Sequence, residues 1–221
     1  DHRAFVNKYL GDGIMAFWGA PVSNPRHALD SCTSVLACID AIDQLDRDPE
    51  YRDMPNLFMR VGVSTGRMMV GDFGAPPRRS DYTVMGDAVN LASRLEQANK
   101  QFDTQVLISA ATFSYVKNQM LTRPIGRLVV VGKTEYEEVY ELLATQDSAT
   151  DEQRELAEAT AAAVTAYQSG NFGAARERFE RLAERFGRTK LIDVYLEACR
   201  THAESAPDPE TWDGTIVLTE K

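Results

Sequence analysis

Cysteine and histidine are scarce in this sequence, and their spacing excludes the common disulfide and zinc patterns. The 221 residues include three histidines and three cysteines, Cys32, Cys38 and Cys199. An odd number of cysteines without a CxxC pair argues against a disulfide framework and a zinc finger, and the scattered histidines argue against a His-ligated zinc site. We therefore expect reduced cysteines in the core, and we expect any bound metal to be a hard cation on carboxylates.

Long apolar runs are also absent. No run of about eighteen apolar residues, the length that spans a bilayer, occurs in the sequence, and no secretory signal peptide is found. The chain opens on Asp1 rather than on a methionine, so we interpret it as part of a longer protein. We expect a cytoplasmic protein with no direct membrane contact through these residues. If the parent protein is anchored in a membrane, we expect the anchor in an upstream sensor region.

Basic residues are outnumbered by acidic ones. The chain carries 24 Lys and Arg against 33 Asp and Glu, for a net charge of -9. A negative surface repels polyanions, which argues against nucleic acid and anionic membranes as partners. With 43% hydrophobic and 26% charged residues, the composition is that of a folded globular protein. The length allows one sizeable hydrophobic core, alone or together with a small additional unit.

The first two thirds of the chain alternate between strand and helix patterns. Short runs of β-forming residues and amphipathic stripes predict an α+β domain over residues 1–144 in which hairpins dominate. We expect strands at 5–9, 14–18, 58–64, 68–73, 105–109, 126–131 and 136–143, and helices at 24–46, from 88 onward, and at 110–117.

Residues 145–221 have a different character and form the second predicted unit. A polar linker at 145–151 leads into three helical patterns, at 152–169, 172–186 and 190–203, and then into a final strand at 215–219. Gly170-Asn171 and Gly187 end the first two helices. So small a helical unit cannot bury its own apolar face. We therefore expect it to pack on the first domain or on another chain, with Trp212 as the anchor of the tail.

Two stretches carry polar residues in patterns that could perform chemistry. The first contains Lys8 and the run Gly11-Asp12-Gly13, and an Asp-Gly pair between apolar runs predicts a tight hairpin. In isolation, Asp12 is explained as a turn former. Lys8 is explained as a strand-edge lysine that discourages aggregation.

The second stretch runs from residue 82 to residue 94 and is predicted to join a turn to a helix. Gly86 supplies a flexible entry, and Asp87 is predicted to be the N-cap. Asn90 and Arg94 are four residues apart, so they project from the same helix face and together could bind an anion. Without further context, a solvated polar stripe is the commoner explanation for such a pair.

Both stretches, in this order, resemble signatures of the class III adenylyl and guanylyl cyclase catalytic domain, of the bacterial adenylyl cyclase type. The resemblance implies a ferredoxin-like core, here starting after its first strand, with a helical extension behind it. It also implies cyclisation of a nucleoside triphosphate to a 3′,5′-cyclic nucleotide and pyrophosphate, in intracellular signalling. By the same resemblance, Asn90 orients the ribose, Arg94 stabilises the α-phosphate in the transition state, and Asp12 holds divalent cations.

The resemblance also assigns the residues that read the base and hold the phosphates. Lys8 and Thr83 take the base-reading positions. A lysine can only donate and a threonine can accept from an exocyclic amine, which fits adenine, so we expect ATP to be preferred over GTP. Lys133 matches the residue that reaches the triphosphate, although the usual basic residue two places earlier is Val131 here. The implied cofactors are two divalent cations, Mg²⁺ or Mn²⁺.

The family builds its active sites across a homodimer, with the metal carboxylates from one chain and the remaining site residues from the other. Its second metal-binding aspartate belongs to a segment that does not precede Phe5 here. We therefore expect this chain alone to be inactive and its parent protein to be active. The loop at 71–79 lacks the Lys-Ser/Thr ending of a P-loop. Residues 166–175 resemble a tetratricopeptide helix-turn-helix.

Two alternative functions remain open from the sequence. The chain could be a catalytically silent cyclase-homology module that dimerises or regulates, or it could be a guanylate cyclase. The silent module is disfavoured because all six assigned residues keep their chemistry: Lys8, Asp12, Thr83, Asn90, Arg94 and Lys133. Glu and Cys would be expected at the base-reading positions of a guanylate cyclase.

Overall fold

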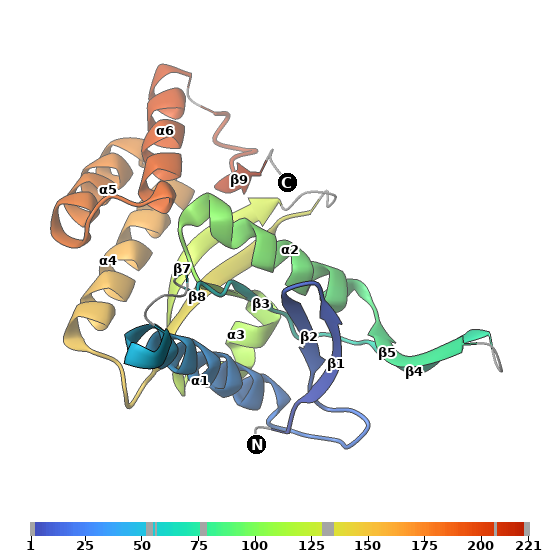
Figure 1. Ribbon diagram of the computed structural model, residues 1–221. Coiled ribbons are helices and arrows are strands. Elements are labelled where there is room, and N and C mark those ends of the chain that lie inside the picture. The colour runs from blue at the N-terminus through green and yellow to red at the C-terminus, as the bar shows by residue number, and fades with distance from the viewer. Residues whose placement is uncertain are drawn as a thin grey trace.

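The fold is mixed α+β, with one five-stranded sheet, two separate β-hairpins and six helices in the part of the chain that is described (Figure 1). The structure is a computed structural model that describes residues 3–51, 55, 57–75, 79–129, 135–205 and 207–218. The first half contains β1 (Phe5–Leu10), β2 (Gly13–Phe17), α1 (His27–Arg47), a 3₁₀ turn (Pro49–Tyr51), β3 (Val61–Val63), β4 (Met69–Ala75), β5 (Arg79–Met85) and α2 (Asp87–Phe102). The second half contains β6 (Val106–Ser109), α3 (Ala110–Val116), β7 (Met120–Val129), β8 (Glu137–Thr145), α4 (Asp151–Gln168), α5 (Phe172–Phe186), α6 (Lys190–Glu204) and β9 (Thr215–Val217).

The five-stranded sheet has the order β3-β6-β8-β7-β9. β3 pairs with β6 and β9 with β7 in parallel, while β8 is antiparallel to both β6 and β7. The hairpin β1–β2 pairs only within itself, and so does β4–β5, which projects from the body as an arm (Figure 1). In the central sheet, β7 and β8 are consecutive along the chain, whereas the other pairings join non-consecutive strands.

The sheet separates two apolar clusters, and successive residues of β6 contribute to different ones. Val106 and Ile108 belong to a cluster with α1 and α3, whereas Leu107 belongs to a cluster with α2 and α4 to α6. This follows from the alternation of side chains across a strand. Because both faces of β6 are covered by helices, all four of its residues are buried.

The helical extension packs on the sheet of the same chain, which confirms one of the two sequence expectations for it. The Tyr195 hydroxyl, fully buried on α6, donates a hydrogen bond of 2.7 Å to the carbonyl oxygen of Ile125 on β7. β9 extends the sheet beside β7, and the Trp212 indole donates to the carbonyl oxygen of Gln168 at 3.1 Å. Trp212 therefore anchors the tail as expected. The tetratricopeptide resemblance stays a prediction.

Several boundaries differ from the sequence expectations for identifiable reasons. Within the segment expected to form a loop, residues 71–75 and 79 belong to strands, because β4 and β5 pair over seven registered positions. β7 is longer than predicted because it accommodates Pro124 at an irregularity in its pairing with β8. Helix α1 begins at His27 rather than at Asn24, whose side-chain oxygen accepts from the Arg26 backbone in a turn.

The cysteines are free, as expected, but only two of the three are in the core. Cys32 and Cys199 are buried, whereas Cys38 is exposed on α1, so the expectation of a core role was wrong for Cys38. Burial raises the pKa of the Cys32 thiol to about 12, which keeps it protonated and unreactive at neutral pH. None of the described helices combines the length and the apolar character that a bilayer crossing requires.

The Tyr195 hydrogen bond generates a stability prediction. We expect Tyr195→Phe to lower the free energy of unfolding by about 1–2 kcal/mol, because the buried carbonyl of Ile125 loses its donor while the ring packing is kept. Urea unfolding followed by circular dichroism measures the change. Tyr115→Phe is the matched control, since that side chain is exposed on α3. Equal unfolding midpoints for both variants would contradict the prediction.

Candidate active site

The β1–β2 hairpin presents Asp12 to solvent at its tip. Gly11 and Asp12 are the two turn residues, and Gly13 already pairs with Leu10 as the first residue of β2. The turn therefore lies one residue earlier than an Asp-Gly turn would. Gly11 has a φ of +66°, which a side chain would strain and which a type II′ turn places at its first central residue. The carboxylate of Asp12 is thus held on a short, regular turn.

A β-bulge interrupts the same hairpin next to Lys8. Val6 pairs with Ala16 and Lys8 with Met15, so Asn7 is the extra residue on its strand. A bulge breaks the strict alternation of side chains and redirects them locally. At this bulge, the side chain of Asn7 contacts strand β5.

Two hydrogen bonds from Asn7 join the β1–β2 hairpin to β5. Its Nδ2 donates to the carbonyl oxygen of Tyr82 at 2.7 Å, and its Oδ1 accepts from the Thr83 hydroxyl at 2.9 Å. The rings of Phe5 and Phe17 pack on Tyr82 beside these bonds. Lys8 is the residue after Asn7, so its backbone adjoins the residue that bonds Thr83. The structure thus joins the two strands that carry the predicted base-reading residues.

Helix α2 carries the other two predicted residues. Gly86 is its N-cap, with a φ of +157°, and Asp87 is the first helical residue. The expectation that Asp87 is the N-cap was wrong, since Gly86 occupies that position. A further correction concerns the residues before Gly86: Thr83 belongs to strand β5, not to a turn. Asn90 is exposed and Arg94 half-buried, and they lie one turn apart on α2.

The position of α2 is set by two residues that the sequence interpretation missed. A Cβ on Gly62 of β3 would overlap the carbonyl oxygen of Ala92 and lie 2.5 Å from the Glu96 nitrogen, so the helix backbone rests directly on the strand. Asn99, fully buried, donates to the carbonyl oxygens of Val61 and Leu95 at 3.0 Å. These contacts fix the distance and rotation of α2 against the sheet.

Only weak sequence signals pointed to these supporting residues. Gly62 lies within an apolar strand run, where a glycine often marks a close backbone approach. Asn99 is a polar residue in the apolar stripe of α2. For Asn7, the regular alternation of a strand predicts a side chain pointing away from that of Lys8, so the bulge concealed its role.

Asp12 can supply only some of the oxygen ligands that a divalent cation needs. One carboxylate on an exposed turn matches the sites in which Mg²⁺ is shared between a protein carboxylate, substrate phosphates and water. Within the described ranges, no three residues of the His, Cys, Asp and Glu types gather into a metal site. Lys133, the predicted phosphate ligand, lies outside the described residues.

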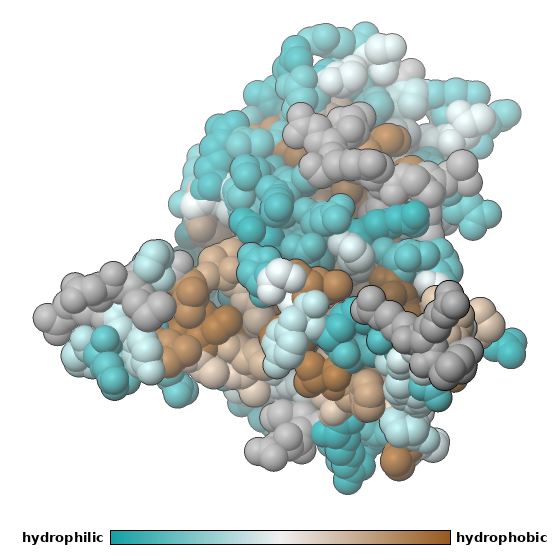
Figure 2. Space-filling model, turned by 45° about the vertical axis from the view of Figure 1, so that its right-hand side comes forward, coloured by the Kyte–Doolittle hydropathy of each residue, from teal (hydrophilic) through white to brown (hydrophobic). Residues whose placement is uncertain are grey.

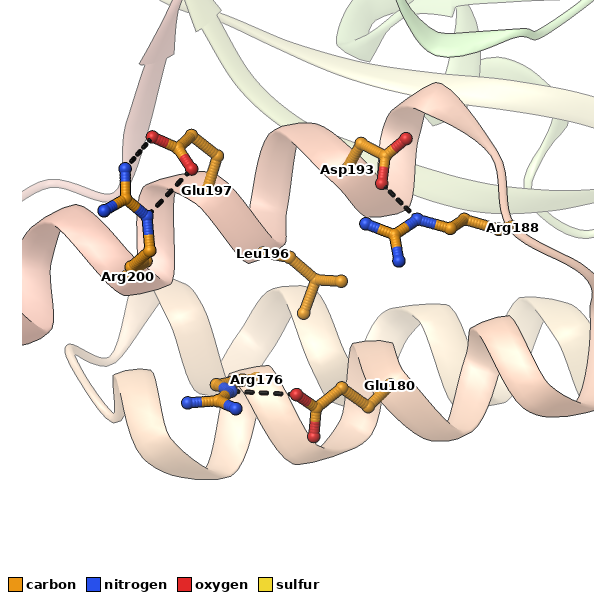
Figure 3. A pocket seen from close by; sticks show the side chains of 7 residues that line it. All are labelled: Arg176, Glu180, Arg188, Asp193, Leu196, Glu197 and Arg200. Atoms are coloured by element: carbon orange, nitrogen blue, oxygen red, sulfur yellow. Dashed lines mark hydrogen bonds and ion pairs between the residues drawn. The ribbon is translucent and has the colours of Figure 1, made fainter.

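A surface hollow lies elsewhere, between α5 and α6 (Figure 3). Its volume is about 610 Å³, and its charged side chains pair with each other around Leu196. Arg176 binds Glu180 at 2.8 Å, and Arg188 binds Asp193 at 2.6 Å. Exposed pairs of this kind contribute little to stability. Because the charges are mutually neutralised, this hollow offers no site comparable to the group around Thr83.

Comparison with known proteins was made on the sequence and on the fold. The family described as "Adenylate and Guanylate cyclase catalytic domain" matches residues 6–144. Adenylate cyclase 1 of Rhizobium meliloti (strain 1021) is 35% identical over 142 residues, which are 64% of this chain and 21% of that protein. The adenylate cyclase of Anabaena cylindrica is 33% identical over 147 residues, 63% of this chain and 28% of that protein. The chain therefore spans a minor part of the curated relatives it matches.

Solved structures give the same result for the fold. The adenylyl cyclase CyaB from P. aeruginosa superimposes with a TM-score of 0.59 at 28% identity, over 67% of this chain and 76% of that chain. A bacterial light-regulated adenylyl cyclase superimposes with a TM-score of 0.53 at 26% identity, over 66% of this chain and 70% of that chain. The predicted α+β cyclase fold is thereby confirmed.

The close contact between α2 and β3 yields a second prediction. We expect Gly62→Ala to destabilise the fold by about 3 kcal/mol, because the added methyl group meets the helix backbone, which cannot rotate away like a side chain. Thermal unfolding measures the loss. Gly71→Ala on β4 is the control, since a Cβ there meets nothing within 4 Å. If Gly62→Ala unfolds at the temperature of the control, the described contact is wrong.

Proposed function

The chain belongs to the adenylate and guanylate cyclase catalytic domain family, and we propose that the protein containing it is an adenylate cyclase that converts ATP into 3′,5′-cyclic AMP and pyrophosphate. The observation that carries this proposal is the hydrogen bonding of Asn7, the residue beside Lys8, to Tyr82 and Thr83 of strand β5. Two named relatives, from Rhizobium meliloti and Anabaena cylindrica, are adenylate cyclases, which supports the same substrate.

The base is read by one donor and one acceptor. The Lys8 ammonium carries only donors, so it suits the unprotonated N1 of adenine. The Thr83 oxygen accepts from the exocyclic amine of adenine. Guanine presents N1–H and O6 at the corresponding positions and matches neither residue, so ATP is selected over GTP.

The residues on α2 act on the ribose and the α-phosphate. Asn90 hydrogen-bonds the ribose and so keeps its 3′-oxygen in line with the α-phosphate. Arg94, one turn further on, faces the charge that develops on the α-phosphate as pyrophosphate leaves. Because α2 rests directly on β3, both side chains project from a rigid base. Lys133 takes the role of holding the leaving pyrophosphate.

Two divalent cations, Mg²⁺ or Mn²⁺, are part of the proposal. When bound, such ions activate the 3′-oxygen and neutralise phosphate charge. Asp12 is the residue of this chain that would hold them. Its exposed position on the hairpin tip leaves room for phosphate oxygens and water to complete the coordination.

A homodimer with shared sites completes the proposal. The two hairpins expose large apolar side chains, which a free surface rarely carries together. In the view of Figure 2, hydrophobic residues reach the surface mainly over the lower, N-terminal part of the molecule, while the helical extension above is largely hydrophilic. Exposed apolar residues of the hairpins are Val6, Tyr9, Leu10, Ile14, Met69, Val70 and Met85. Pairing along this surface brings Asp12 of one chain towards α2 of the other.

Residues 145–221 brace this catalytic domain rather than take part in the reaction. We place the boundary at residue 144, where the family match also ends. The brace acts through the core cluster shared by α2, the sheet and α4 to α6. On this assignment, the helical extension holds α2 from the side opposite the nucleotide.

A cyclase assay on the full-length natural protein tests the proposed function. We expect cyclic AMP from ATP with Mg²⁺ or Mn²⁺, and much slower turnover of GTP. Arg94→Ala should lower kcat by about 10²–10³-fold with little change in KM, because its charge acts mainly in the transition state. Arg178→Ala, exposed on α5, is the control and should keep full activity. Absence of any cyclic nucleotide, or equal use of ATP and GTP, would refute the proposal.

Mixing two inactive variants tests the shared sites. Asp12→Ala and Arg94→Ala impair different half-sites, so a mixed dimer keeps one intact site. After equal mixing and exchange of subunits, we expect about a quarter of the wild-type activity to return. Each variant alone and an equal mixture of Arg94→Ala with Arg94→Lys serve as controls. A mixture no more active than its components would argue that each chain holds its own site.

A further inference from the structure

We propose that Asn7 is a positioning residue that fixes the Thr83 hydroxyl as a hydrogen-bond acceptor and thereby sets the preference for adenine. This inference rests on the proposed function, because it concerns how the base is read. It adds a residue that does not itself contact the nucleotide.

The orientation of the Asn7 amide follows from its two partners. The carbonyl oxygen of Tyr82 can only accept, so the amide nitrogen of Asn7 must face it, at 2.7 Å. The amide oxygen then faces Thr83, at 2.9 Å, and cannot donate. The opposite amide orientation would place oxygen against oxygen at Tyr82. The backbone of β5 therefore decides which group Thr83 meets.

The Thr83 hydroxyl has one hydrogen, which it donates in a hydrogen bond to the amide oxygen of Asn7. What remains for any other partner is a lone pair, so Thr83 accepts but does not donate. Only 7% of Thr83 is exposed, which means that bulk water does not provide an easy alternative acceptor for that hydrogen. The direction of the hydroxyl is thus set by the protein.

The bulge at Asn7 couples this arrangement to Lys8. In a regular strand, Asn7 and Lys8 would point to opposite faces, but the extra residue in the β1–β2 pairing removes that constraint. One short segment can then supply a donor to the base through Lys8 and orient the acceptor through Asn7. Adenine offers an amine to the Thr83 oxygen, whereas guanine offers its O6 oxygen, which the lone pair repels.

The test measures kcat/KM for ATP and for GTP in the full-length natural protein. We expect Asn7→Ala to lower the ATP-to-GTP ratio about tenfold, because the released Thr83 hydroxyl can rotate and donate to O6 of guanine. If Asn7→Ala does not fold, Asn7→Leu, of similar size and without polar atoms, replaces it with the same expectation. Asn118→Ala, exposed in the turn after α3, should leave the ratio unchanged.

A double variant shows whether Asn7 acts through Thr83. In a Thr83→Val background there is no hydroxyl to orient, so adding Asn7→Ala should leave the ratio unchanged. A further fall in that background would overturn the inference, and so would equal losses of kcat/KM for both nucleotides in Asn7→Ala. In both cases, the proposed function stands as long as the wild type cyclises ATP in preference to GTP. If the wild type shows no preference for cyclising ATP, both the proposed function and this inference are refuted.

Discussion

The direct contact of helix α2 with strand β3 is the constraint on which the candidate site depends. Gly62 lets the helix backbone lie on the strand, and buried Asn99 of α2 donates a hydrogen bond to the carbonyl oxygen of Val61 on β3. A wider spacing would move Asn90 and Arg94 outward together. The chemistry proposed for these side chains therefore relies on residues that have no chemical role of their own.

The fold was largely predictable because its signals are local. Hydrophobic periodicity identified α1, α2 and the three helices of the extension, and α5 has the predicted limits at both ends. Turn residues identified the β1–β2 hairpin. The pairing of β4 with β5 across residues 71–79 was missed because glycine and proline there outweigh the strand pattern. The order of the central sheet depends on contacts between distant segments, which no local pattern encodes.

The candidate site was predictable at the level of residue type but not of geometry. Lys8 and Thr83 were assigned from motifs about 75 positions apart, and the structure joins the strands that carry them through Asn7. A bulge arises from one extra residue in a pairing register, and a single strand read by itself cannot reveal it. The N-terminal end of α2 shows the same limit, because Gly86 rather than the acidic Asp87 is the N-cap residue.

The parallel pairing of β9 with β7 has a consequence for how the protein is made. The core cluster beneath α2 takes members from Leu91 to Leu218, and it includes Ile216 of β9 itself. The part of this sheet face that α4 to α6 cover therefore stays exposed until the ribosome has released nearly all of these residues. During synthesis, the first domain exposes these apolar side chains for the time needed to translate the three helices that follow it. Exposed apolar surface of this kind is what chaperones bind.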